Sequence, residues 1–353
     1  MYFFRREKIQ CRYQFSLRDA VDITLLQRAL TAALASAPYY TQRLVQEKRE
    51  MWLEPNTEPC LVYPGSTMRN IPEQTNGYLF CVSCEGDTVY FDWHHFLLDG
   101  HGVSPLLTSI LEQYCNLRYG TAFAVPQIVC DPPYDMEAML AEYPPVEYGS
   151  DVIQRDVVQT YEGALRRTRV CLSKQSLVEK ALANNAKPVS ALMGLLCMAM
   201  REYLGKEKIQ YSYSSDTRDV AGVPNALYNC VCSFGHTVQL QAQTRLADFV
   251  ADVDADIRRD LQPQSKRRRM ADQMGWVYKV NQQKAPLRIK QRVFQMGEYI
   301  GGTISDFWLS YLGNPLMPAT PELAQYTTDF GVWVPPDGCL LYTSPSPRDI
   351  SGS

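Results

Sequence analysis

Histidine is concentrated in one short stretch of this chain. Three of the four histidines lie between residues 90 and 102, in the string YFDWHHFLLDGHG, with an aspartate among them. Imidazole is the side chain best suited to transferring protons near neutral pH. An alternating run over 87–93 predicts a β-strand that ends at the paired histidines, and loops on a rigid scaffold often carry function. The stretch is therefore the candidate active site.

An imidazole at the end of a strand has the properties that a general base requires. A base that removes a hydroxyl or amine proton during attack on a thioester must be well positioned and have a pKa near the working pH. No serine or cysteine nucleophile is needed if the acceptor attacks directly. Asp99 follows in the same loop and could orient the ring, as in a hydrolase triad. The alternative is a buried histidine pair that only closes the strand.

The string His94-His95-x-x-x-Asp99-Gly100 resembles the signature of a known superfamily. That superfamily contains CoA-dependent acyltransferases such as chloramphenicol acetyltransferase and the condensation domains of peptide synthetases. Within that superfamily, the chain most resembles stand-alone alcohol acetyltransferase-like proteins. The resemblance implies that His95 is the general base and that Asp99 is structural, pointing away from the ring and pairing with an arginine. His94 and Gly100 support the motif.

A later segment extends the resemblance. The strand-like run over 209–219 ends in Asp-x-Arg, as in related enzymes, and this implies a salt bridge between Arg218 and Asp99. The neighbouring Asp216 and Asp219 are the alternative partners of Arg218. An asparagine usually follows this segment in the superfamily, and Asn229 fits that place.

Ser310 is the candidate for stabilising negative charge. It lies in the string Ser310-Tyr-Leu-Gly313, which is similar to a Ser-x-Leu-Gly strand beside the superfamily's channel. A tetrahedral intermediate needs hydrogen bonds where its charge develops. The alternative is a structural hydroxyl on a strand.

Two other chemistries use parts of the same stretch. A metal site could involve His94, His95, Asp99 and His101, but adjacent strand residues point to opposite faces, and no further ligand lies at a suitable spacing. We therefore expect no metal. His94 and Asp99 also match the His-x4-Asp spacing of membrane glycerolipid acyltransferases. No apolar run of about 18 residues is present, so we expect no stable membrane insertion.

Composition indicates a folded protein of two domains. The chain has 353 residues, of which 46% are hydrophobic and 21% charged. The net charge of −3 argues against a nucleic-acid partner. The basic run over 266–269 is typical of a solvated loop or helix end, and the alternative is a phosphate clamp for coenzyme A. The amino terminus lacks the apolar core of a signal peptide, and eleven cysteines show no disulfide-like framework, which predicts a cytoplasmic location.

The elements predict an α/β fold. By resemblance it consists of two chloramphenicol-acetyltransferase-like subdomains, each a mixed sheet with flanking helices, with an active-site channel between them. The divisions are 1–125, a proline-rich crossover over 126–150, and an incomplete second subdomain over 151–338. The predicted strands cover 11–17, 51–53, 59–63, 77–84, 87–93, 168–172 and 209–216. The predicted helices begin at Asp22, at Ser104-Pro105, and near 173, 190 and 245.

The last fifteen residues, 339–353, resemble a translated sequencing adaptor. We expect them to be a non-native tail without ordered structure, which would leave the second subdomain truncated.

These observations predict an acyltransferase. An acyl group moves from a thioester donor, acyl-CoA, to an alcohol or amine in one ternary-complex step, without a covalent enzyme intermediate or a cofactor. Transfer to oxygen is favoured over transfer to nitrogen. The alternatives are a condensation enzyme acting on substrates bound to carrier proteins, and a catalytically silent binding protein with the same fold.

Overall fold

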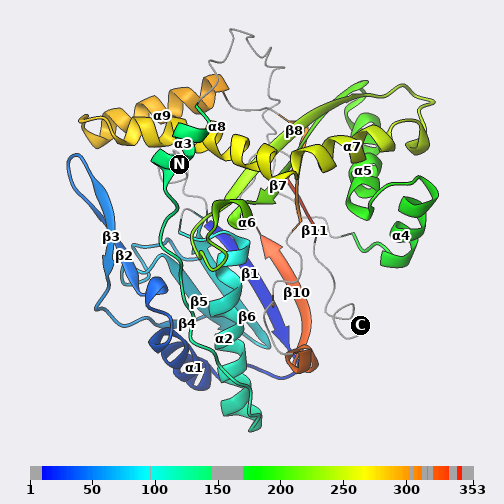
Figure 1. The fold of residues 1–353 in the computed structure, drawn as a ribbon. Coiled ribbons are helices and arrows are strands. Elements are labelled where there is room, and N and C mark those ends of the chain that lie inside the picture. The colour runs from blue at the N-terminus through cyan, green and yellow to red at the C-terminus, as the bar shows by residue number, and fades with distance from the viewer. Residues whose placement is uncertain are drawn as a thin grey trace.

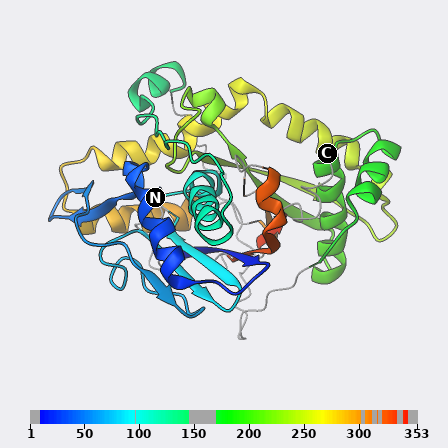
Figure 2. The same cartoon turned by 90° about the horizontal axis from the view of Figure 1, so that it is seen from below.

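Two β-sheets of mixed strand direction, each with helices packed against it, organise the protein (Figure 1). The structure is a computed structural model that describes residues 10–95, 97–144, 170–301, 305–311, 316, 321–333 and 340–343. The first sheet has the strand order β10-β1-β6-β5-β4 and the second has the order β11-β9-β7-β8. Strands β2 and β3 form a separate hairpin. In Figure 2 the blue and cyan strands of the first sheet lie at the lower left, and green helices lie at the right.

The elements follow one another in chain order. The strands are β1 (Gln10–Leu17), β2 (Gln42–Gln46), β3 (Met51–Pro55), β4 (Val62–Pro64), β5 (Phe80–Glu85), β6 (Thr88–His94), β7 (Lys208–Asp216), β8 (Val231–Gln239), β9 (Phe307–Tyr311), β10 (Thr327–Trp333) and β11 (Leu340–Thr343). The helices are α1 (Ile23–Ala35), α2 (Gly100–Tyr119), α3 (Met136–Glu142), α4 (Lys174–Ala183), α5 (Pro188–Leu204), α6 (Arg218–Ala221), α7 (Val250–Asp260), α8 (Pro263–Asn281) and α9 (Leu287–Gly301), with short 3₁₀ turns at 38–40, 246–248 and 321–325.

Alternation along β1 and β6 produces the first core. Tyr13 and Phe15 of β1 and Phe91 of β6 are fully buried together with the apolar faces of α1 and α2. Helix α1 begins where Asp22 caps it, since its carboxylate accepts hydrogen bonds from the backbone N–H groups of Thr24 and Leu25. The predicted strands over 11–17, 51–53 and 87–93 and the helix capped by Asp22 are confirmed. The strands expected over 59–63 and 77–84 are the shorter or shifted β4 and β5, and β2 was not predicted.

Strand β10 belongs to the first sheet, which corrects the predicted division at residue 150. It runs antiparallel to β1, with Phe330 opposite Phe15. The Phe330 ring lies 5.2 Å from that of Tyr13 and 4.8 Å from that of Phe15. The chain therefore returns from the second sheet to the first. There β10 pairs with the edge of β1 that β6 leaves open, and Phe330 packs beside the two rings. No local pattern along the chain encodes that return.

Helix α2 starts earlier than predicted. Its N-cap is Asp99, whose carboxylate accepts the N–H of Gly102, and Pro105 lies inside the helix instead of in its first turn. The helical hydrogen bonds have already begun before Pro105, since the N–H of Val103 donates to the Asp99 carbonyl at 3.1 Å, so the proline leaves the carbonyl of His101 without its usual helical donor. The Asp99 cap is stronger than the Ser104-Pro105 signal, so it sets the boundary.

Several weaker predictions also need correction. Residues 170–172 form no strand, and 168–169 lie outside the described residues. The crossover contains α3, which Asp135 caps. The expected helix over 245–261 is a 3₁₀ turn followed by α7. The helices predicted near 173 and 190 are confirmed as α4 and α5.

Part of the tail that we expected to be unstructured forms a strand. Residues 340–343 make β11, which pairs in parallel with β9. The backbone of an edge strand offers hydrogen-bonding groups to any extended segment within reach, whatever its side chains. Residues 339 and 344–353 lie outside the described residues.

A buried ion pair connects β1 and β6 on the face of the first sheet away from α1 and α2. Arg12 and Asp92 are opposite one another in the ladder, with Nε–Oδ1 and Nη2–Oδ2 distances of 2.5 and 2.7 Å. The carboxylate is 1% exposed. Burial raises the pKa of Asp92, and the hydrogen bonds and charge of Arg12 oppose that rise. Arg12 also lies over the Tyr90 ring.

We predict that Arg12→Met lowers the free energy of unfolding by about 3–5 kcal/mol near neutral pH, because it leaves a buried carboxylate without its counterion. A raised folded-state pKa means that folding takes up a proton, so the loss shrinks as the pH falls through that pKa. Urea unfolding of Arg12→Met and of the double variant Arg12→Met/Asp92→Leu, at two pH values, measures this. A double variant as unstable as the single one would contradict it.

Candidate active site

The two motif histidines sit where β6 ends. His94 is the last residue of the strand and is buried, and its backbone N–H donates to the carbonyl of Leu79 at 2.9 Å. His95 is the next residue, lies in a turn, and is half-buried. His95 is the histidine of the two that the chain leaves nearer to solvent.

Aromatic side chains from the first core hold the loop that follows. The indole N–H of Trp93 donates to the carbonyl of Leu98 at 3.1 Å, and the Tyr39 hydroxyl donates to that of Leu97 at 3.0 Å. Both leucines are buried. The loop between β6 and α2 is therefore fixed by hydrogen bonds as well as by packing, which is the condition for placing His95 reproducibly.

Asp99 points away from His95 and into the protein interior. Its Oδ1 accepts from Arg218 Nη2 and from the N–H of Gly102, both at 2.8 Å, and its Oδ2 accepts from the N–H of Cys230 at 2.9 Å. The side chain is 1% exposed. A carboxylate with these partners joins elements together; the arrangement differs from a hydrolase triad, in which the acid contacts the histidine.

Arg218 satisfies its donors in the same place. Besides Asp99, its guanidinium donates to the carbonyls of Ala226 at 2.7 Å and Tyr228 at 2.9 Å, and to Asp216 Oδ2 at 3.0 Å. The predicted Asp99–Arg218 bridge is present, and so is the alternative partner Asp216. The pKa of Arg218 is raised, because the nearby carboxylates outweigh the opposing effect of burial. The planar fork of an arginine makes this many-sided contact possible.

Residues 226–230, called the docking segment below, directly precede β8 of the second sheet and pack against the first turn of α2. Gly102 is where the approach is closest, because a Cβ added there would lie 1.9 Å from the carbonyl oxygen of Leu227. On the other side, the Tyr40 hydroxyl donates to the Gly102 carbonyl at 2.6 Å. Only a glycine allows the first turn of α2 to meet the docking segment.

Asn229, also in the docking segment, contacts the candidate base. Its Nδ2 lies 3.2 Å from His95 Nδ1 and 3.4 Å from the His95 carbonyl oxygen. Its Oδ1 accepts the N–H of Val231 at 3.1 Å. The structure thus brings together His95, Asp99, Arg218 and Asn229 from segments more than a hundred residues apart. The superfamily pattern pointed to this asparagine, but its contact with His95 was not predicted.

His101 is on the first turn of α2 and does not join His95. It is 58% exposed, and its Nδ1 lies 3.6 Å from Asp216 Oδ2. Within the described residues, no three His, Cys, Asp or Glu side chains are arranged to hold a metal ion. The fourth histidine, His236, lies against Asp260 on the far side of β8, with Nε2–Oδ2 at 2.5 Å.

Ser310 lies on β9, half-buried, and no contact with His95 places it at the base. The register pairs Leu309 with Tyr213 in parallel, so Ser310 lies near the end of β9 that matches the Asp216 end of β7. It is thus at the sheet edge that carries the motif arginine. Gly100 is the first residue of α2, directly after the Asp99 cap.

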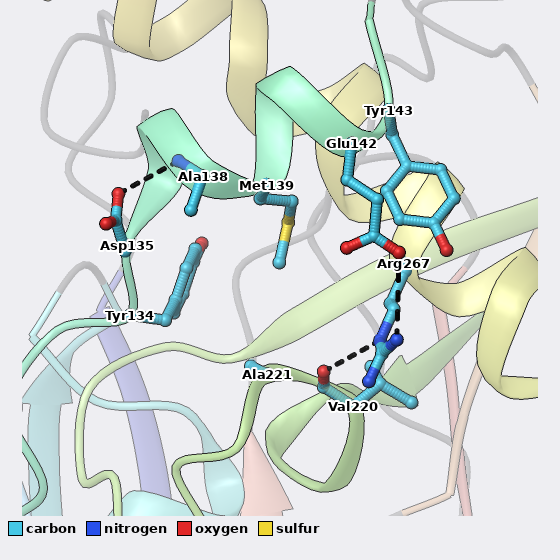
Figure 3. A pocket seen from close by; sticks show the side chains of 9 residues that line it. All are labelled: Tyr134, Asp135, Ala138, Met139, Glu142, Tyr143, Val220, Ala221 and Arg267. Atoms are coloured by element: carbon cyan, nitrogen blue, oxygen red, sulfur yellow. Dashed lines mark hydrogen bonds and ion pairs between the residues drawn. The ribbon is translucent and has the colours of Figure 1, made fainter.

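A cavity of about 260 Å³ opens on the other side of α6 (Figure 3). Its lining comes from three helices and the residues beside them: Tyr134, Asp135, Ala138, Met139, Glu142, Tyr143, Val220, Ala221 and Arg267. None of the motif residues lines it. The helix α6 that it borders begins with Arg218, but neither Arg218 nor His95 lines the cavity.

The basic run over 266–269 is part of α8, not a loop. Lys266 is buried and pairs with Asp219 at 2.5 Å. Arg267 donates to the carbonyl of Val220 at 3.2 Å, and Arg269 donates to that of Ser233. Arg268 contacts Asp272 and the carbonyl of Pro144. These contacts connect α8 to its neighbours, although the Arg267 side chain stays 44% exposed.

Several solved structures have a similar fold. Polyketide synthase associated protein 5 from Mycobacterium tuberculosis aligns over 96% of this chain and 86% of its own, with a TM-score of 0.65 and 17% identity. The first condensation domain of the CDA synthetase aligns over 96% and 82%, with 0.60 and 13%. F. sporotrichioides TRI101, complexed with coenzyme A and T-2, aligns over 95% and 88%, with 0.57 and 11%. No family model and no curated protein sequence matches the chain.

These similarities define the fold class. Two mixed sheets with flanking helices, in the arrangement shared with condensation domains and chloramphenicol-acetyltransferase-like proteins, confirm the predicted α/β fold. Among the helices of the described ranges, none combines the length and the apolar character needed to cross a bilayer.

We predict that Gly102→Ala destabilises the protein more than Ser104→Ala, although both add or remove a single small group near the start of α2. The new methyl would overlap the Leu227 carbonyl, and overpacking of this kind costs about 1–3 kcal/mol or more. Ser104→Ala removes one hydrogen bond to the Gly100 carbonyl, worth about 1 kcal/mol. Chemical denaturation of both variants tests this, and equal losses would show that the docking segment is not held against α2.

Proposed function

We propose that the protein is an acyltransferase that moves an acyl group from a thioester to a small-molecule acceptor, with His95 as the general base. The observation that carries this proposal is the half-buried His95 at the end of β6, in a loop that the Asp99–Arg218 pair and the docking segment hold. The fold class, shared with condensation domains and with a protein crystallised with coenzyme A, supports it.

The proposed chemistry is one ternary-complex step. His95 takes the proton from the acceptor hydroxyl as its oxygen forms a bond to the thioester carbonyl carbon. The tetrahedral intermediate then collapses, the carbon–sulfur bond breaks, and the proton on His95 passes to the leaving sulfur, which departs as a thiol. No covalent enzyme intermediate and no metal or organic cofactor takes part. Ser310 is the candidate donor to the oxyanion, and His94, Asp99, Gly100 and Arg218 support the loop.

The substrates follow from the same reasoning. We propose an alcohol as the acceptor in preference to an amine, because a hydroxyl needs a base more than a neutral amine does. We propose acyl-CoA as the donor, with the two substrates meeting in a channel between the two sheets. The protein would then act in the cytoplasm on freely diffusing thioesters, without nucleic acid or a membrane.

The second candidate function is condensation of substrates bound to carrier proteins. The likeness to the first condensation domain of the CDA synthetase favours it. Offering acyl-CoA and acyl-carrier-protein donors side by side, with release of free thiol as the readout, distinguishes the two.

We predict that His95→Ala lowers the rate of thiol release from the preferred acyl thioester by about 10²–10⁴-fold, the usual contribution of a positioned general base. His101→Gln is the matched control, because it removes a histidine of the same stretch that is 58% exposed on α2. Its rate should stay within about twofold of wild type. A normal rate in His95→Ala, with a panel of acyl-CoAs and alcohols, would exclude His95 as the base.

A further inference from the structure

The hydrogen bonds of Asn229 determine which end of its amide faces His95. The backbone N–H of Val231 donates to Asn229 Oδ1 at 3.1 Å, so this oxygen must be the acceptor. The other end, Nδ2, carries two hydrogens and can only donate. It lies 3.2 Å from His95 Nδ1 and 3.4 Å from the His95 carbonyl, so one hydrogen is available for each. If the amide were reversed, its NH₂ group would face the N–H of Val231, and that N–H would have no acceptor.

A donor facing Nδ1 has a consequence for the ring. In a neutral imidazole one nitrogen is a donor and the other an acceptor, and the bond made by one decides where the hydrogen lies. With Asn229 donating to Nδ1, the hydrogen of neutral His95 lies on Nε2. A ring in that form can donate from Nε2 but cannot take up a proton there.

We propose that Asn229 is a positioning residue that keeps His95 in the Nε2–H tautomer in the free protein. This rests on the proposed function. Nε2 then becomes a base only when the Asn229 side chain releases Nδ1, a water molecule takes the hydrogen from Nε2, and a proton from water adds to Nδ1. The expected benefit is selectivity, because water entering before the acceptor finds no free lone pair on Nε2, and the bound thioester is spared hydrolysis.

The surroundings of Asn229 make such a constraint specific. The residues on either side of it are clamped, since Arg218 donates to the Tyr228 carbonyl and Asp99 accepts from the Cys230 N–H. The backbone of Asn229 is therefore held by the same ion pair that shapes the His95 loop. Ring and amide are positioned by one set of contacts, although they lie 134 residues apart in the chain.

Asn229→Asp is the informative variant. A carboxylate of the same shape still accepts from Val231, so the docking segment keeps its hydrogen bond, but its second oxygen can only accept from Nδ1. The ring hydrogen should then move to Nδ1 and leave a lone pair on Nε2. Asn184→Asp, at the end of α4, adds the same charge away from the motif and serves as the control.

The first measurement needs no substrate. Nitrogen NMR of the full-length protein labelled with ¹⁵N-histidine, near pH 8 so that an ordinary histidine is neutral, reports which ring nitrogen carries hydrogen. With only four histidines, His94→Gln, His101→Gln and His236→Gln variants assign the His95 signals. We expect Nε2–H in the wild type and in Asn184→Asp, and Nδ1–H in Asn229→Asp. Nδ1–H in the wild type, or no change in Asn229→Asp, would overturn the proposal.

The second measurement tests the consequence. Thiol release from the preferred acyl thioester without acceptor should rise by about tenfold in Asn229→Asp, which corresponds to 1.4 kcal/mol, while Asn184→Asp matches the wild type. A residue with only a structural role would instead lower hydrolysis and transfer together. If no thioester is consumed by any form of the protein, the proposed function fails, and the NMR result still decides the tautomer.

Discussion

The ion pair between Asp99 and Arg218 is the contact on which the site depends. Each partner is almost fully buried, and each also binds the docking segment over 226–230, the carboxylate through the Cys230 N–H and the guanidinium through two carbonyls. A buried pair adds little net stability compared with apolar side chains of the same size. What it provides is geometry, because the charges tolerate few arrangements in which every lone pair and N–H has a partner.

That geometry joins two halves of the chain. The His95 loop leaves the end of β6 in the first sheet, whereas Arg218 follows β7 and the docking segment precedes β8 in the second. Gly102 allows the backbones of α2 and the docking segment to approach, and the Tyr40 hydroxyl donates a hydrogen bond to the Gly102 carbonyl. Strand β10 adds a second connection, since it carries the chain back to β1. The position of His95 therefore reflects both sheets, although its own sequence neighbourhood lies in one.

The local patterns predicted the parts well where one strong signal was present. Alternation identified β1 and β6, a capping residue followed by a periodic apolar face identified α1, and a run rich in Leu, Met and Ala identified α5. Prediction was wrong where two signals competed, as at α2, where Asp99 and Ser104 both fit an N-cap and Asp99 is the residue that caps the helix. The motif string led to His95 and Asp99, and its resemblance to a superfamily added Arg218, which the structure places in the predicted bridge. Ser310 is near the right sheet edge but has no contact that assigns it a role.

The sequence alone determined the residue types of the site, the α/β class and the helices and strands with clear periodicity, because these depend on the chemistry and spacing of neighbours along the chain. Only the tertiary structure decided that β10 joins the first sheet, that the basic run of α8 makes contacts within the protein, and that Asn229 faces His95 Nδ1. Each of these depends on groups far apart in the chain meeting at distances of about 3 Å. Such meetings follow from packing and from the need to satisfy buried polar groups, which no local pattern encodes.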